Sequence, residues 1–186
     1  KLAKVIPIFM KGSKTTMSNY RPISLLSVFA KTFEKIMYNR LIQYLDRHDI
    51  LYDNQFGFRS GFSTNMALVE FTKKIKDDFE KKQFVIGIFL DLSKAFDCIN
   101  HNILLNKLEH YGIRGNILDW FKSYLNNRKQ YTCINHKSSN LHHISTGVPQ
   151  GSVLGPLLFS LFVNDFQYVS QHLYSIMFAD DTSLFI

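Results

Sequence analysis

Cysteine, proline and tryptophan are all scarce in this chain of 186 residues, which has two cysteines, four prolines and one tryptophan. Cys98 and Cys133 stand in unrelated contexts, without the paired spacing of a structural zinc site or of a disulfide framework. Such sparse cysteine fits a reducing compartment, and no signal peptide is recognisable. We therefore expect an intracellular protein, located in the nucleus or the cytoplasm.

Long apolar runs are missing as well. The longest one, residues 153–163, contains Gly155 and Pro156 and is too short to span a bilayer, so we expect no transmembrane segment and no membrane partner. Apolar residues nevertheless make up 46% of the chain, which is enough for a hydrophobic core and excludes a disordered protein. The length suits one domain or one and a half domains.

Positive charge is in excess, with a formal net charge of +7 and an isoelectric point of about 9.4. A balance of this kind favours a polyanionic partner, nucleic acid first. Most of the 17 phenylalanines will pack in a core, but rings beside a basic surface also suit the stacking of bases. On charge alone, a merely basic soluble protein remains the alternative.

Apolar periodicity predicts two long helices in the first half of the chain. One covers residues 27–47, with Ser27 as its cap, and the other covers residues 64–82, with Ser63 or Thr64 as its cap. We expect the apolar stripe of each helix to face the core. The stripes consist of Phe29, Phe33, Ile36, Met37, Leu41, Tyr44 and Leu45 in the first helix and of Leu68, Thr72, Ile75 and Phe79 in the second.

Shorter elements complete an α+β pattern. The continuous apolar run at residues 85–90 is typical of a buried strand. The other predicted elements are extended segments at 5–9 and 20–23, helices at 103–111, 115–125 and 156–164, and hairpins made of 130–134 with 142–146 and of 175–178 with 182–186.

Carboxylates occur where two of these apolar strands end. Asp91 follows the strand at 85–90, and Asp180 and Asp181 form the tip of the last hairpin. Each site alone has a simpler explanation, because aspartate is a common turn residue. If the strands are neighbours, however, Asp91 and Asp180 meet, and carboxylates packed beside apolar strands need a cation. Such oxygen ligands suit Mg²⁺.

Five segments of the sequence resemble the motifs of one protein family. They are YRPIS at residues 20–24, QFGFRSGFST at 55–64, FLDLSKAFD at 89–97, GVPQGSVLGP at 147–156 and FADD at 178–181. In this order they resemble the fingers and palm motifs of reverse transcriptases. The amino-acid sequences of these motifs are most similar to those of non-LTR (LINE-like) retrotransposon enzymes of the jockey and chicken-repeat type. The resemblance covers nearly the whole chain.

The resemblance implies a right-hand polymerase fold, with fingers in residues 1–84 and palm in residues 85–186. The palm would include a helical and hairpin segment at 100–146 and would rest on a small antiparallel sheet. The chain starts without methionine and stops at Ile186 in a strand-like pattern, so we interpret it as a C-terminally truncated piece that lacks the thumb. We expect such a piece alone to bind primer–template weakly and to show little synthesis.

The implied activity is that of an RNA-directed DNA polymerase, a nucleotidyltransferase of a mobile element. It would add dNTPs to the 3′ end of a DNA primer on an RNA template. Two Mg²⁺ ions, or Mn²⁺, would serve the phosphoryl transfer. The catalytic and metal-binding residues implied by the family are Asp91, Asp180 and Asp181, with the backbone carbonyl of Leu92 as a further ligand. Asp181 would contribute charge more than direct ligation.

The resemblance also implies residues that bind the nucleotide. Arg59, in its glycine-flanked loop, would reach the triphosphate, because a guanidinium fork suits phosphate oxygens. Arg21 and Lys31 are further candidates for phosphate or template backbone, although Lys31 could be a plain surface lysine.

Two more segments would shape the nucleotide site. Phe96 would lie under the incoming sugar and reject a 2′-hydroxyl; the alternative is one more core phenylalanine. Gln150 and Gly151 would lie near the nascent base pair; the alternative is a simple turn.

Three other functions remain open at this level. The first is a group II intron reverse transcriptase, which shares the motifs. The second is an RNA-dependent RNA polymerase, which shares them in part, but Phe96 disfavours RNA synthesis because a small residue there would have favoured it. The third is an inactive, truncated remnant of a mobile element that only binds nucleic acid.

Overall fold

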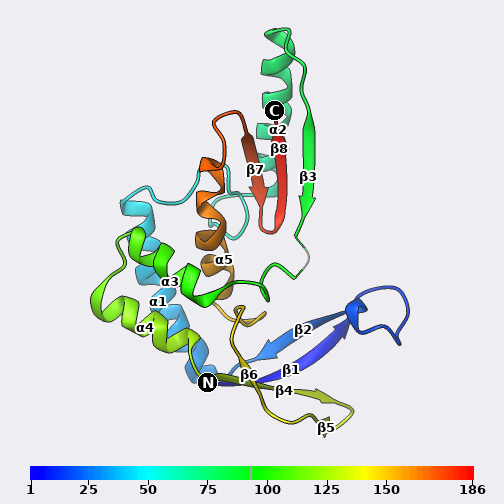
Figure 1. The fold of residues 1–186 in the computed structure, drawn as a ribbon, viewed down its shortest axis with the longest axis vertical. Helices are drawn as coiled ribbons and strands as arrows, with labels where there is room; N and C mark the ends of the chain where they lie inside the picture. Colours follow the sequence, from blue (N-terminus) through cyan, green and yellow to red (C-terminus); the bar gives the residue numbers. More distant parts are fainter. Residues whose placement is uncertain (93) are drawn as a thin grey trace.

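The computed structural model describes residues 1–92 and 94–186, and shows two small sheets with a bundle of helices to one side of them (Figure 1). Ser93, inside the motif at 89–97, lies outside the described residues. No helix in this described part is both long and apolar enough to cross a membrane.

The helical bundle contains the larger core. It consists of α1 (Val28–Arg47), α3 (His101–His110), α4 (Gly115–Leu125) and α5 (Gly155–Val163). Leu45, Leu104, Phe121 and Leu158 are completely buried between these helices. Pro156 lies in the first turn of α5, as predicted, where a missing N–H leaves no hydrogen bond unmade. The predicted helices are all confirmed, with ends that differ by at most two residues.

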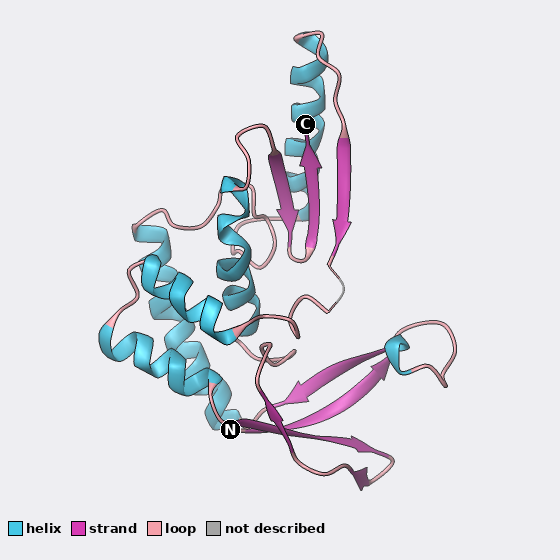
Figure 2. Cartoon of the chain, in the orientation of Figure 1, coloured by secondary structure: helices cyan, strands magenta, loops and turns pink. Residues whose placement is uncertain are grey.

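The first sheet joins segments that are far apart in the chain (Figure 2). It contains β1 (Leu2–Phe9), β2 (Tyr20–Leu25), β4 (Arg128–Ile134), β5 (Lys137–Ser138) and β6 (His142–Ile144), and a 3-10 turn, η1 (Met17–Asn19), precedes β2. β1 pairs antiparallel with β2 and parallel with β4, and β4 pairs antiparallel with β6. The predicted hairpin of β4 and β6 is therefore confirmed, and it lies in one sheet with the N-terminal strands. The boundary at residue 84 stays a prediction.

The second sheet is antiparallel throughout, as predicted. Its order is β3 (Gly87–Asp91), β8 (Asp181–Phe185) and β7 (Tyr174–Phe178). The helix α2 (Thr64–Glu80) packs against this sheet, where Phe71 contacts Phe185 with ring centroids 5.1 Å apart. The sheet, α2 and α5 lie next to one another in Figure 1.

The predicted core stripe of α1 is only half right. Its second half is buried, with Leu41 and Leu45 at 5% and 0% exposure. Phe29 and Phe33, in the first half, are exposed at 80% and 63%, because none of the described elements covers that end of the helix. The cap is confirmed, since the hydroxyl of Ser27 accepts a hydrogen bond from the backbone N–H of Ala30.

The predicted stripe of α2 is wrong at Leu68 and Phe79, which are 63% and 71% exposed. The helix packs through Ala67, Phe71 and Ile75, so the prediction is right at Ile75 but the buried face lies to one side of the predicted stripe. Because α2 is amphipathic, periodicity alone did not separate these two adjacent faces. The cap at Ser63 is confirmed.

The strand β3 forms where it was predicted but is not buried. It is the edge strand of its sheet, and Phe89 is 67% exposed. One side of it still meets α2, where the Phe89 ring stacks on Phe71 with centroids 6.1 Å apart. An apolar run indicates a strand but does not decide how many of its faces are covered.

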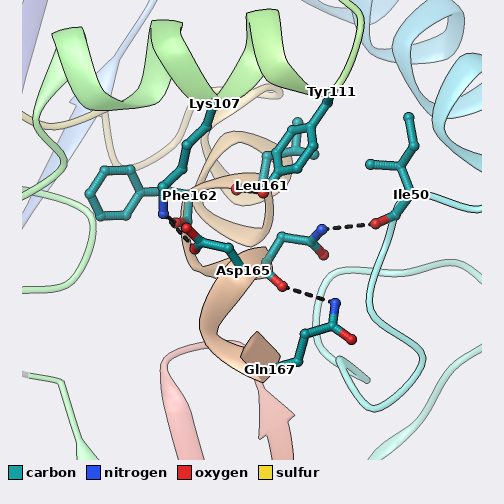
Figure 3. Close-up of polar contacts among 8 residues, drawn as sticks. Ile50, Lys107, Tyr111, Leu161, Phe162, Asp165 and Gln167 are labelled. Carbon is teal, nitrogen blue, oxygen red and sulfur yellow. Dashed lines mark hydrogen bonds and ion pairs between the residues drawn. The ribbon is translucent and has the colours of Figure 1, made fainter. Parts of the chain in front are cut away.

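A polar junction closes the end of α5, where a 3-10 turn, η2 (Asn164–Tyr168), follows the helix. Lys107 of α3 donates hydrogen bonds to the carbonyl of Phe162 and to the carboxylate of Asp165 (Figure 3). Asn164, which is 4% exposed, donates to the carbonyl of Ile50 and accepts from the N–H of Tyr52. This junction fixes the start of the loop that leads to Arg59.

Candidate active site

The register of the second sheet places two carboxylates opposite each other. Asp91 is the last residue of β3 and pairs with Asp181, the first residue of β8. Asp180 belongs to the two-residue turn between β7 and β8, together with Ala179. We predicted that Asp91 and Asp180 meet. The pairing of β3 with β8 places Asp181 directly opposite Asp91, and Asp180 precedes Asp181 in the chain. All three carboxylates therefore belong to the same end of the sheet.

These carboxylates fit a hard cation only in part. Within residues 1–92 and 94–186 there is no group of three or more histidine, cysteine, aspartate or glutamate side chains close enough to hold a metal ion. Mg²⁺, however, takes one or two protein carboxylates and completes its shell with water and substrate phosphates. Asp91 and Asp181 are exposed, so such additional ligands have access. The three-carboxylate site and the role of the Leu92 carbonyl stay predictions.

The loop that precedes Arg59 contacts the hairpin along β7, on the edge of the sheet opposite to β3. The N–H of Phe56 donates to the carbonyl of Met177, and the N–H of Met177 donates to the carbonyl of Asn54, both at 2.8 Å. Gly57 lies directly against the turn, because a Cβ on it would be 2.0 Å from the backbone nitrogen of Ala179. The motif at 55–64 thus contacts the motif at 178–181 through backbone atoms.

Arg59 folds back onto its own loop. Its Nη1 donates to the carbonyl of Tyr52 at 2.8 Å and, at 3.5 Å, to that of Gln55, and its guanidinium lies 4.1 Å from the ring centroid of Phe62. These contacts fix the direction of the side chain next to the hairpin. Triphosphate binding by Arg59 stays a prediction.

Phe96 lies between the core and the open side of the site. Its ring centroid is 5.1 Å from that of the buried Phe159 and 5.8 Å from that of Phe58, whose own side chain is exposed. Phe96 itself is half-buried. The ring therefore has a packing role on one face and leaves surface for a ligand, so both sequence interpretations keep a physical basis.

The motif at 147–156 forms a loop that joins the first sheet to the segment that follows β3 and leads into the helical core through α5. The side chain of Gln150 donates to the carboxylate of Asp97 at 3.2 Å, and the backbone carbonyl of Gln150 accepts from the N–H of Ser24 in β2 at 2.7 Å. Gly151 has φ +109°, and a Cβ there would be 2.8 Å from the carbonyl oxygen of Ser24. Glycine is thus required by the close approach of β2.

Arg21 and Lys31 lie further out. Arg21 is exposed on β2, opposite Ile8 of β1, and Lys31 is exposed in the first turns of α1. Neither side chain hydrogen-bonds to another residue in the part of the chain that the structure describes, and their phosphate-binding roles stay predictions.

Sequence reasoning missed Glu34, to which it gave no role. Its carboxylate is 2% exposed and accepts from the N–H of Val153 at 2.7 Å, from that of Leu154 at 3.4 Å and from the hydroxyl of Tyr124. Burial, and secondarily the charge of Glu34, raises the pKa of Tyr124 well above its ordinary value of 10.0. A lone acidic residue inside an apolar stripe was the only signal for this contact, which holds the end of the Gln150 loop.

A small antiparallel sheet with carboxylates at its hairpin end, a helical bundle behind it and a second sheet beside it define the class: a right-hand nucleic-acid polymerase with fingers and palm. The comparisons with known proteins narrow this class. Residues 11–186 match the family model described as "Reverse transcriptase (RNA-dependent DNA polymerase)", and the chain belongs to this family.

Curated relatives come from mobile elements of Drosophila melanogaster. The chain is 37% identical over 172 residues to "Probable RNA-directed DNA polymerase from transposon BS" and 35% identical over 166 residues to "RNA-directed DNA polymerase from mobile element jockey". Each match covers 89% of this chain and 18% of the relative. The chain thus spans about a fifth of the length of these relatives, which are non-LTR retrotransposon enzymes.

Solved structures support the fold. A telomerase from Candida tropicalis, solved with a fragment of telomeric RNA, matches with a TM-score of 0.67 at 13% identity, covering 99% of this chain and 36% of that one. At such low identity the likeness concerns the fold alone, and it confirms the fingers and palm arrangement.

Proposed function

We propose that this chain is the catalytic segment of a non-LTR retrotransposon reverse transcriptase, which adds dNTPs to the 3′ end of a DNA primer on an RNA template. The observation that carries the proposal is the pairing of Asp91 with Asp181 at the hairpin end of the palm sheet, in a chain of the reverse transcriptase family. The proposal extends the family membership to substrates, metal and individual residues.

Asp91, Asp180 and Asp181 would hold the divalent metal, with the carbonyl of Leu92 as a further oxygen ligand. When bound, a pair of Mg²⁺ ions supplies activation of the attacking 3′-hydroxyl and stabilisation of the leaving pyrophosphate. The chain contributes the fixed position of these oxygens. β-pairing sets Asp91 against Asp181, and the short turn keeps Asp180 at the same end of the sheet.

The nucleotide would lie between the palm sheet and the motif loops. Arg59 uses Nη1 for its own loop, which leaves its other N–H donors for triphosphate oxygens. The exposed part of Phe96 would pack against the sugar and exclude a 2′-hydroxyl. Gln150 and Gly151 would border the nascent base pair, and Arg21 and Lys31 would contact phosphates of nucleotide or template.

The test is a primer-extension assay with an RNA template, a DNA primer, dNTPs and Mg²⁺ or Mn²⁺. Because the chain spans about a fifth of its relatives, we would assay both the 186-residue chain and a chimera in which it replaces the matching segment of the Drosophila melanogaster jockey polymerase. We expect the chimera to extend the primer with dNTPs, and chelation of the metal by EDTA to stop it. A folded chimera that incorporates no dNTP under any of these conditions contradicts the proposal and favours an inactive, nucleic-acid-binding remnant.

A further inference from the structure

We propose that Gln55 is a positioning residue whose side-chain oxygen fixes the turn that carries Asp180, and thereby sets the metal affinity of the hairpin. The inference rests on the proposed metal-binding role of Asp180. Gln55 stands in the motif at 55–64, but the resemblance gave it no role of its own.

The turn needs support from outside. Only Ala179 and Asp180 connect β7 to β8, and Ala179 has φ +59°, in the left-handed region. Alanine disfavours this region because its Cβ approaches the following carbonyl, and tight hairpins therefore prefer glycine or asparagine there. The sequence of the turn does not stabilise its own geometry.

Gln55 provides that support. Its Oε1 accepts hydrogen bonds from the N–H of Ala179 at 3.3 Å and from the N–H of Gly57 at 2.9 Å. Gln55 is 2% exposed, so these bonds form away from bulk water and water does not compete for them. One oxygen atom thus ties the residue before Asp180 to the loop of Arg59.

The position of Gln55 is itself fixed. It is flanked by the two backbone hydrogen bonds that join Asn54 and Phe56 to Met177. The absence of a Cβ at Gly57 lets the loop lie directly on Ala179. A shift of the turn would therefore have to break the contact with Gln55 before it could move Asp180.

The choice of glutamine has a chemical reason. Its Nε2 is buried and has no hydrogen-bond partner in the part of the chain that the structure describes, an arrangement that is costly for stability. Methionine would avoid this cost but would lose the acceptor. Glutamate would keep the acceptor but would add negative charge beside the aspartates of the hairpin. Glutamine accepts the two N–H groups without altering the charge of the site.

The test measures metal binding and the turn separately, on the ¹⁵N-labelled 186-residue chain. Mn²⁺ is titrated, and the paramagnetic broadening of the amide signals of Asp180 and Asp181 gives the half-saturating concentration. Amide hydrogen exchange at Gly57 and Ala179 reports their hydrogen bonds. The variants are Gln55→Met, which is similar in size and lacks the acceptor, and Gln55→Glu, which keeps it. Gln167→Met in η2 is the matched control, since among the described residues Gln167 donates only to the carbonyl of Asn164.

We expect Gln55→Met to raise the half-saturating Mn²⁺ concentration about three- to tenfold, which corresponds to the loss of a hydrogen bond of ordinary strength. The amides of Ala179 and Gly57 should exchange faster in the same variant. Gln55→Glu should keep both amides protected and bind Mn²⁺ at least as tightly as the original chain, and Gln167→Met should change neither readout. If Gln55→Met does not fold, Gln55→Asn, whose shorter side chain withdraws the oxygen from Ala179, is judged by the same criteria.

Two outcomes separate this inference from the proposed function. If Asp91→Asn weakens Mn²⁺ binding but Gln55→Met leaves both readouts unchanged, the positioning role is overturned while the metal site stands. If Asp91→Asn leaves the broadening of Asp180 and Asp181 unchanged, the metal site itself is overturned, and the role of Gln55 in metal binding with it.

Discussion

Asp91 and Asp181 face each other across the β3–β8 ladder, each at the end of its strand. Directly opposed residues of an antiparallel pair have Cα atoms about 4.5–5.5 Å apart. Two carboxylates so placed repel each other unless a cation or a proton lies between them. The pairing therefore links the register of a three-stranded sheet to metal binding, and the first prediction concerns it.

We expect Asp91→Asn to abolish dNTP incorporation by the jockey chimera while the fold is retained, because asparagine fills the same volume but removes one of the opposed charges. Primer extension and circular dichroism would measure the two properties. Asp53→Asn, in the exposed loop after α1, is the matched control and should keep the activity. Near-normal rates in Asp91→Asn would show that this carboxylate is not a metal ligand.

The second prediction concerns the choice of sugar. Phe96→Ala should raise the use of rNTPs relative to dNTPs by about tenfold or more, the order expected when a steric contact of 1–3 kcal/mol is removed. Competition between the two nucleotides in the chimera measures the ratio. Phe159→Leu removes part of the packing under Phe96 and is the control for a purely structural effect. An unchanged ratio of rNTP to dNTP use in Phe96→Ala would show that Phe96 serves only in core packing.

The third prediction concerns the buried carboxylate of Glu34. Glu34→Ala should lower the free energy of unfolding by about 2–4 kcal/mol, because the N–H groups of Val153 and Leu154 and the hydroxyl of Tyr124 lose their acceptor. Urea unfolding measures the change. Glu80→Ala, at an exposed ion pair with Lys76, should stay within about 0.5 kcal/mol. Equal changes in the free energy of unfolding for the two substitutions would contradict the structural role of Glu34.

The fourth prediction concerns alkaline pH. Burial raises the pKa of Tyr124 above 10.0 in the folded chain, so below pH 10 folded and unfolded chains both hold the proton. Above pH 10 the unfolded chain releases it first, and the free energy of unfolding falls by about 1.4 kcal/mol per pH unit for this group. Tyr124→Phe should make the fall between pH 10 and 11 shallower and leave the slope between pH 7 and 9 unchanged. An identical alkaline slope in both chains would contradict the raised pKa.

The fifth prediction concerns the contact between the loop and the hairpin. Gly57→Ala should cost about 1–3 kcal/mol, because the new Cβ would overlap the backbone of Ala179. Gly87→Ala, in β3 and with only ordinary contacts around the new Cβ, should be neutral or slightly stabilising. Thermal unfolding compares the two variants. If both alanines are tolerated equally, the loop does not need its close approach to the turn.

The sequence by itself determined the elements and the family. Helix caps at Ser27 and Ser63, the strand before Asp91 and the final hairpin follow from local rules of backbone and side-chain preference, and the structure confirms all of them. The five motifs carried the resemblance, and the family comparison confirms it. These features depend on residues that are near one another in the chain.

Tertiary structure alone decided which faces are covered and which residues meet. Periodicity placed Leu68 and Phe79 of α2 in the core, but the sheet packs on the face next to them. The position of Asp181 opposite Asp91 depends on strand register. The hydrogen bond from the N–H of Ala179 to the side chain of Gln55 joins residues that are 124 positions apart. Contacts of this kind depend on how elements dock, because the energy of a packed face or a buried hydrogen bond exists only once the distant partner is in place.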